Sequence, residues 1–229
     1  MTDEDVAPGH RSIELGFTND AGRRLAGTLE LPVAVGPPPV VVFAHGVESS
    51  RASSRNRAIA ERLLVEGIAA YRFDFTGHGE SEGTREEATI DRMVADLAGA
   101  LETMKQHNDV DPARIGVSGS GTGGVVALHV AARDERVRVL VLRSVPADGL
   151  DDVAREVRVP TLVIAGEHDW PVVSEGETLA SLIAADHSFV VIPEAGRLFE
   201  GHGQAAHVAL LSAKWFADHL TLGAVAERQ

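Results

Sequence analysis

The chain has 229 residues and carries 21 Lys and Arg against 34 Asp and Glu, which gives a formal net charge of −13 at pH 7. This acidic balance disfavours nucleic acid and membrane surfaces as partners, because phosphate backbones and anionic lipids repel a negatively charged protein. The sequence contains no cysteine, which excludes disulfides, thiolate zinc sites, iron–sulfur clusters and cysteine nucleophiles. Its length suits one α/β domain.

The two ends of the sequence are expected to be tails. The first ten residues, MTDEDVAPGH, lack the basic and apolar regions of a signal peptide, and no apolar run is long enough to span a membrane. We therefore expect a cytoplasmic protein with a flexible tail over residues 1–11, one domain over residues 12–220 and a C-terminal tail over residues 221–229. The sequence indicates no oligomeric state.

The first elements along the chain predict an antiparallel hairpin. Ile13, Leu15 and Phe17 alternate with polar residues, which is the pattern of a half-buried strand. Turn-forming residues follow at 19–22, and a second strand-like run covers residues 25–31.

After three consecutive prolines at 37–39, the pattern changes to continuous apolar runs, which are typical of strands buried on both faces. These runs cover residues 40–44, 68–73, 115–118, 137–142, 161–165 and 188–192. Helical periods lie between them, around residues 59–64 and over 90–104, 122–133 and 204–220. Ser174 followed by Glu177 is a capping-box signature for one more helix. The alternation predicts a mostly parallel sheet of about eight strands, flanked by helices on both faces.

In such sheets, ligands bind beyond the carboxyl ends of the strands. Four of these strand ends carry distinctive motifs: His45-Gly46-Val47, Asp74 to Ser81, Gly119-Ser120-Gly121-Thr122-Gly123-Gly124, and Gly166-Glu167-His168-Asp169.

Taken together, these motifs resemble those of α/β-hydrolases, nearest the small, lidless branch that includes dienelactone hydrolases and related serine esterases. The resemblance covers about residues 12–220 and implies an α/β-hydrolase fold. The segment between the strands at 137–142 and 161–165 is too short for a cap domain, so we expect any pocket to be shallow and open.

The family uses a nucleophile on a sharp strand-to-helix turn, an acid after a later strand and a histidine after the last strand. Aligning the motifs keeps the acid as Asp169, but it places Gly121 at the nucleophile and Arg197 at the histidine. Glycine has no oxygen to form an acyl-enzyme, and a guanidinium stays protonated and cannot act as a base. Ordinary ester hydrolysis is therefore not expected.

The remaining charged and backbone groups favour a binding site. Arg197 and Asp169 at paired positions predict a bidentate ion pair. The resemblance implies that backbone N–H groups at Gly46, Val47 and Thr122 surround an oxyanion hole, and a helix N-terminus attracts anions. Trp170 either lines this pocket or covers the sheet edge. The expected ligand is a small carbonyl, carboxylate or ester compound, with phosphate as a further anion that the hole suits.

Three functions follow from these observations. The first is a protein that has lost covalent catalysis and binds a ligand or partner. The second is a lyase, cyclase or isomerase that uses the oxyanion hole with Asp169, Arg197 or His202 but forms no acyl-enzyme. The third is an esterase with a displaced nucleophile, Ser120, and base, His202; Ser120 is otherwise a small packing residue and His202 a loop histidine. The histidines show no metal-ligand spacing, and no cofactor is implied.

Overall fold

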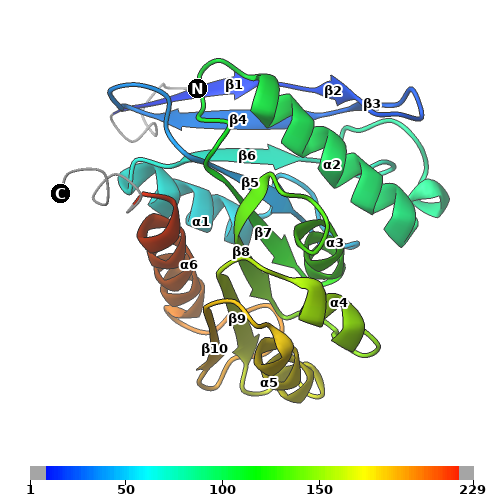
Figure 1. Cartoon of the computed structure of the whole chain (residues 1–229), viewed down its shortest axis with the longest axis vertical. Coiled ribbons are helices and arrows are strands. Elements are labelled where there is room, and N and C mark those ends of the chain that lie inside the picture. The colour runs from blue at the N-terminus through cyan, green and yellow to red at the C-terminus, as the bar shows by residue number, and fades with distance from the viewer. Residues whose placement is uncertain (1–8, 222–229) are drawn as a thin grey trace.

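A central eight-stranded sheet organises the protein, whose computed structural model describes residues 9–221 (Figure 1). The strands lie in the order β1-β4-β6-β5-β7-β8-β9-β10. β4 runs antiparallel to both β1 and β6, and the strands from β6 to β10 are parallel to their neighbours. The structure therefore confirms the predicted mostly parallel sheet of about eight strands.

The strands are bounded as follows: β1 (His10–Glu14), β2 (Phe17–Thr18), β3 (Arg24–Leu25), β4 (Gly27–Pro32), β5 (Val40–Ala44), β6 (Ala69–Phe73), β7 (Ile115–Ser120), β8 (Val137–Arg143), β9 (Thr161–Gly166) and β10 (His187–Ile192). The helices are α1 (Ser54–Val65), the 3₁₀ turn η1 (Arg85–Glu87), α2 (Ile90–Gln106), α3 (Thr122–Ala131), α4 (Asp151–Glu156), α5 (Val172–Leu182) and α6 (Gln204–Leu220).

The predicted N-terminal hairpin is present. β1 pairs with β4, and β2 and β3 form a small separate ribbon around the turn at 19–22. β1 begins at His10, inside the segment predicted as a tail over residues 1–11, because His10 and Arg11 pair with Pro32 and Leu31. Residues 1–8 of the first predicted tail and 222–229 of the second lie outside the described residues.

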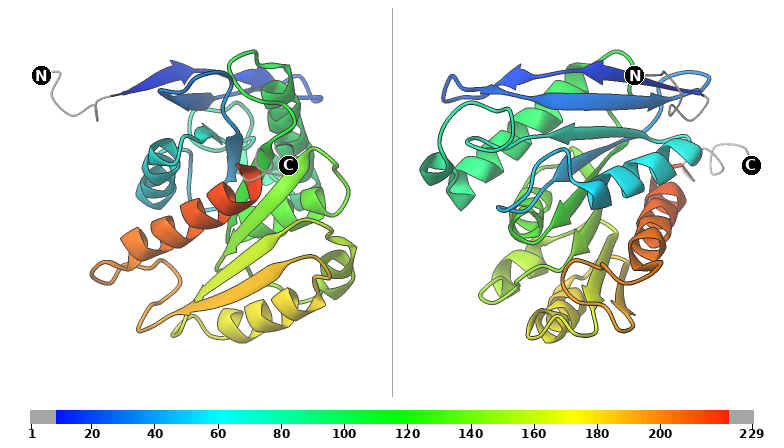
Figure 2. Two further views of the ribbon diagram at one scale, coloured as in Figure 1. Left: turned by 60° about the vertical axis from the view of Figure 1, so that its left-hand side comes forward. Right: turned by 180° about the vertical axis from the view of Figure 1, so that it is seen from behind.

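Helices cover both faces of the sheet and divide the apolar core into two layers. α1 and α6 pack on one face over Val41, Phe43 and their neighbours, and α2, α3, α4 and α5 cover the other. Figure 2 shows α1 and α6 together on the side opposite α2. All residues of β5 and β6 are buried; β5 is apolar without alternation for this reason, and the buried Arg72 of β6 pairs with Glu30 on β4. Among residues 9–221, no helix combines the length and the apolar run that a bilayer crossing requires.

The start of α5 differs from the prediction. α5 begins at Val172 with Pro171 as its N-cap, so Ser174 lies within the helix and the capping-box prediction was wrong. The turn after β9 starts the helix earlier than the local sequence signature indicates.

The segment between β8 and β9, all of it described, holds one six-residue helix, α4, which matches the expected absence of a cap domain.

A buried carboxylate joins three segments at the carboxyl end of the sheet. Asp96 on α2 is fully buried, and its oxygens accept hydrogen bonds from Asn19 Nδ2 at 2.8 Å and Thr76 Oγ1 at 2.7 Å. The backbone N–H of Thr76 donates at 2.9 Å, and Arg92 Nε donates at 2.9 Å from the preceding helical turn. Asp96 therefore ties α2 to the β2–β3 turn and to the segment after β6.

We predict that Asp96→Ala lowers the free energy of unfolding by about 3–5 kcal/mol, because the buried donors and the Arg92 charge lose their acceptor. Urea denaturation measures the change. Asp91→Ala, at an exposed position of the same helix, is the matched control and should cost about 1 kcal/mol or less. Equal losses for the two variants would contradict this role for Asp96.

Candidate functional site

The strand-to-helix turn between β7 and α3 is made by one residue, Gly121. Its backbone has φ +55° and ψ −126°, a conformation that side chains with a Cβ rarely adopt. The Gly121 N–H donates to the carbonyl of Arg143 at 3.0 Å, and its own carbonyl accepts from the N–H of Gly124 at 2.9 Å. These bonds hold the start of α3 against the end of β8.

The neighbouring glycines serve packing, whereas Gly121 has open space beside it. A Cβ on Gly123 would lie 2.2 Å from the carbonyl oxygen of Ala44, so α3 can approach β5 only with glycine there. A Cβ on Gly121 would meet nothing closer than Arg197 Nη2, at 3.7 Å. Position 121 therefore has space for a side chain, which would face the Arg197 guanidinium, although the positive φ strains any residue with a Cβ.

A pocket of about 390 Å³ lies beside this turn, at the carboxyl ends of the central strands. Its lining includes most of the residues predicted for the site. The full lining is Gly46, Val47, Glu48, Ser49, Ser53, Arg55, Asn56, Ser120, Gly121, Thr122, Ser144, Arg197 and Leu198.

The loop that carries Arg197 is fixed to the end of β8. Ser144, the residue after β8, has φ +48° and is buried. Its Oγ donates to the Arg197 carbonyl at 3.1 Å, and its N–H donates to Ile164 on β9 at 2.9 Å. The backbone at 197 is therefore held close to Gly121.

The predicted ion pair between Asp169 and Arg197 was wrong. Within residues 9–221, no carboxylate oxygen of Asp169 lies within 4.0 Å of an Arg197 nitrogen, and Asp169 Oδ2 is buried without a hydrogen-bond partner. The physical reason is the empty space at Gly121, toward which the long guanidinium extends. Asp169 and Arg197 therefore do not form an ion pair.

Asp169 lies in the turn between β9 and α5. Its N–H donates to the carbonyl of Gly166 at 3.0 Å, and its carbonyl accepts from the N–H of Val173 at 2.8 Å. The residue is 7% exposed. Trp170, which follows it, is 75% exposed and is not among the pocket-lining residues, so the first of its two expected positions is not the one observed.

Comparisons with known proteins identify the family. A family model described as serine aminopeptidase, S33, matches residues 36–149. A dienelactone hydrolase from Anabaena variabilis has a solved structure with TM-score 0.82 and 31% identity, covering 93% of this chain and 99% of that chain. The protein belongs to the α/β-hydrolase superfamily.

Two curated relatives of this α/β-hydrolase are longer proteins. One, from Mycobacterium tuberculosis, bears the name "Putative phosphoribosyl transferase" and is 35% identical over 198 residues, 86% of this chain and 44% of its own length. The thiohydrolase aneE of Aspergillus aculeatus is 34% identical over 129 residues, 56% of this chain and 40% of its own length. The chain thus spans less than half the length of these relatives.

The pocket of this α/β-hydrolase is built without histidine. None of the ten histidines, all of them within residues 9–221, is part of its lining. Ser120 lines the pocket, but His202 is exposed in the loop before α6, so the structure does not bring the predicted nucleophile and base together. His168 is also exposed.

Sequence reasoning missed several polar residues of the site: the lining also contains Glu48, Ser49, Ser53, Arg55, Asn56 and Ser144, and Arg143 contacts Asn56. Arg55 and Asn56, from the first turn of α1, line the pocket. Arg143, the last residue of β8, is 1% exposed and lies directly beneath it, paired in register with Ser120 on β7. The available signal was an arginine, Arg143, directly after the apolar run at residues 139–142 of this strand.

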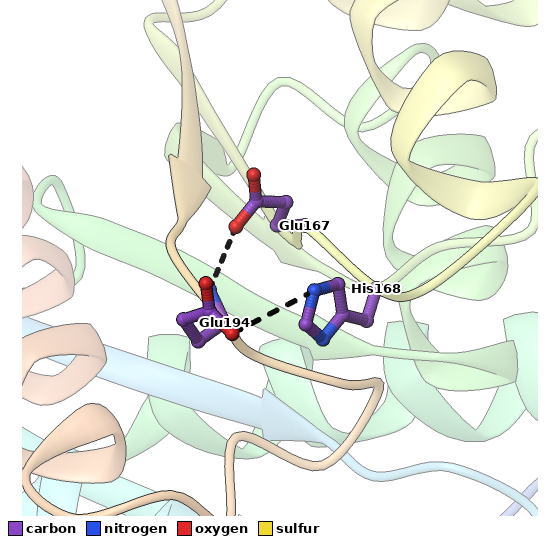
Figure 3. A group of neighbouring side chains, drawn as sticks. All are labelled: Glu167, His168 and Glu194. Atoms are coloured by element: carbon purple, nitrogen blue, oxygen red, sulfur yellow. Dashed lines mark hydrogen bonds and ion pairs between the residues drawn. The ribbon is translucent and has the colours of Figure 1, made fainter.

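A second polar group lies at the surface near β9 and β10. Figure 3 shows Glu194 between Glu167 and His168; the candidate ligand atoms of the three residues lie within 4.8 Å of one another, and all three are exposed. The Glu194 N–H donates to Glu167 Oε2 at 2.8 Å. This grouping, which the sequence analysis did not identify, explains how the loop after β10 is held against the turn after β9.

The loop that carries Gly46 and Val47 is anchored by a buried imidazole. His45 Nδ1 lies 2.8 Å from the Gly46 carbonyl oxygen, and the N–H of Phe75 donates to Nε2 at 3.2 Å. These contacts require the neutral ring protonated on Nδ1. Burial lowers the pKa of His45 from its ordinary 6.5 to about 4, against the smaller raising effects of the Gly46 hydrogen bond and the Asp74 charge.

We predict that His45 makes the protein acid-sensitive. The unfolded chain takes up a proton at His45 as the pH falls below 6.5, while the folded chain resists until about 4. Relative to His45→Gln, which cannot titrate, the wild-type free energy of unfolding should fall by about 3 kcal/mol between pH 7 and pH 4. Chemical denaturation at a series of pH values measures this; parallel profiles for the two proteins would refute it.

Proposed function

We propose that this protein retains the α/β-hydrolase fold but has lost covalent ester hydrolysis, and that it binds a small ligand non-covalently in the pocket beside Gly121. The main support for the proposal is the backbone conformation of the turn at Gly121. Gly121 adopts the strained conformation of a nucleophile elbow, has room for a side chain, and has none.

The chemistry of the lining supports this function. An acyl-enzyme needs an oxygen or sulfur nucleophile and a base to accept its proton, whereas Gly121 offers a hydrogen atom and Arg197 a permanent cation. Loss of the nucleophile from a comparable triad costs on the order of 10⁶ in turnover. Asp169, as the retained acid, has no imidazole to orient.

The backbone of the pocket still supports ligand binding. Within the described chain, the N–H groups of Val47 and Thr122 donate to no protein acceptor, and both residues line the pocket. Thr122 is the first residue of α3, whose N-terminus attracts negative charge. We expect these donors to act as an oxyanion hole for an oxygen of the bound carbonyl, carboxylate or ester compound.

Covalent labelling tests the loss of the nucleophile. We expect no mass increase after incubation with a fluorophosphonate, because these reagents react with an activated serine. Intact-mass spectrometry measures the adduct, and a serine esterase treated in parallel is the positive control. An adduct on Ser120 would overturn the proposal.

Restoring two side chains tests the scaffold. Gly121→Ser places a hydroxyl where a Cβ would meet nothing closer than Arg197 Nη2, and Arg197→His supplies an imidazole at the position that the family resemblance assigns to the base. The double variant should hydrolyse a short-chain nitrophenyl ester at least about a hundredfold faster than the wild type, because general-base catalysis of this kind contributes about 10²–10⁴. Each single variant is the matched control and should stay at the wild-type rate. Wild-type hydrolysis as fast as that of the double variant would contradict the proposal.

A further inference from the structure

Positive charge gathers at this pocket although the chain as a whole carries −13. Arg55 and Arg197 line the pocket, and Arg143 is buried beneath it. Within residues 9–221, no carboxylate oxygen lies within 4.0 Å of a nitrogen of any of these three arginines. On so acidic a protein, a cluster of cations without counter-charges indicates that a ligand supplies the negative charge.

The one acidic residue of the lining does not neutralise the cluster. The side chain of Glu48 is 89% exposed and lies 3.8 Å from the guanidinium of Arg85. The Glu48 carboxylate therefore lies at the rim of the pocket, near Arg85.

A buried polar pair orients a donor toward the pocket. Asn56 is 3% exposed and lines the pocket, and its Oδ1 accepts a hydrogen bond from Arg143 Nη2 at 2.7 Å. Since the oxygen faces the buried cation, the amide NH₂ is the group left for the pocket, and no protein acceptor within the described residues receives it. Arg143 Nε is itself buried without a partner.

Hydroxyl groups complete the lining with further donors. Ser49, Ser53, Ser120 and Thr122 all border the pocket. Together with the free N–H groups at Val47 and Thr122, they offer hydrogen bonds around the same space as the two guanidinium groups.

We propose that the ligand carries a doubly charged oxyanion of the phosphate-monoester type, bound between Arg55 and Arg197 with Asn56 and the N-terminus of α3. The inference rests on the proposed function, because it places the anion where an acyl-enzyme would otherwise form. A phosphate monoester carries about −1.5 to −2 charges at pH 7 and three acceptor oxygens, which matches two unpaired guanidinium forks. A single carboxylate matches only one.

Calorimetric titration with inorganic phosphate tests the charge of the ligand, with acetate as the singly charged comparison at the same ionic strength. We expect phosphate to bind with a dissociation constant at least about tenfold below that of acetate, because it contacts both arginines. Equal affinities, or no measurable binding of phosphate, would overturn the proposal.

Substitution of the two lining arginines tests their contribution. Arg55→Gln and Arg197→Gln should each weaken phosphate binding about tenfold to a hundredfold, as expected for loss of a charge-assisted contact. Arg57→Gln is the matched control, because Arg57 is exposed on the same helix, α1, and lies outside the pocket lining. A loss of affinity in the control as large as in the two site variants would contradict the assignment.

Asn56→Asp separates binding from folding, because its two effects have opposite directions. The new carboxylate gives Arg143 a buried partner, so the melting temperature should rise by about 2–4 °C. The same charge repels the anion, so phosphate affinity should fall at least about tenfold. Unchanged phosphate affinity in the folded variant would contradict the proposal.

The outcomes distinguish this inference from the proposed function. If no fluorophosphonate adduct forms and phosphate does not bind, the non-covalent function stands and the anionic ligand is refuted. If Ser120 is labelled and phosphate still binds through the two arginines, the loss of catalysis is refuted and the anion subsite stands.

Discussion

The site depends on a backbone constraint at one residue. At Gly121 the chain passes from a strand into a helix within a single residue, which adopts a positive φ that residues with a Cβ rarely adopt. The sharp turn brings the first N–H groups of α3 to the carboxyl edge of the sheet, and Gly123 allows the helix to approach β5. In a catalytic hydrolase the same turn strains a nucleophile. Here glycine relieves the strain and leaves the apex without a reactive atom.

The open space beside Gly121 affects where the nearby charged side chains lie. The Arg197 guanidinium extends toward Gly121 rather than toward Asp169, and the carboxylate of Asp169 is left buried with an unpartnered oxygen. Arg143 is likewise buried without a carboxylate partner within the described chain. A buried charge without a counter-charge destabilises a fold, and Arg143 contacts Asn56 of the pocket lining, which supports a functional reason for its placement.

Buried polar anchors hold two loops of the pocket in place. His45 fixes the loop before Val47, and Ser144 fixes the loop that carries Arg197. Such anchors preorganise a binding site, because its loops need little ordering when a ligand binds. The acid sensitivity expected from His45 is the consequence of burying an imidazole in this role.

The sequence alone determined the sheet, its flanking helices and the residues at its carboxyl edge, because buried parallel strands and helices have different apolar periods and because ligand sites follow strand ends. It also identified Gly121 and Arg197 at the apex and beside it. Only the tertiary structure decided the direction of the Arg197 side chain, the exposure of Trp170 and the meeting of Arg55, Asn56 and Arg143. Side-chain direction and contacts between segments far apart in sequence depend on the space left by neighbouring residues, and no local pattern encodes that space.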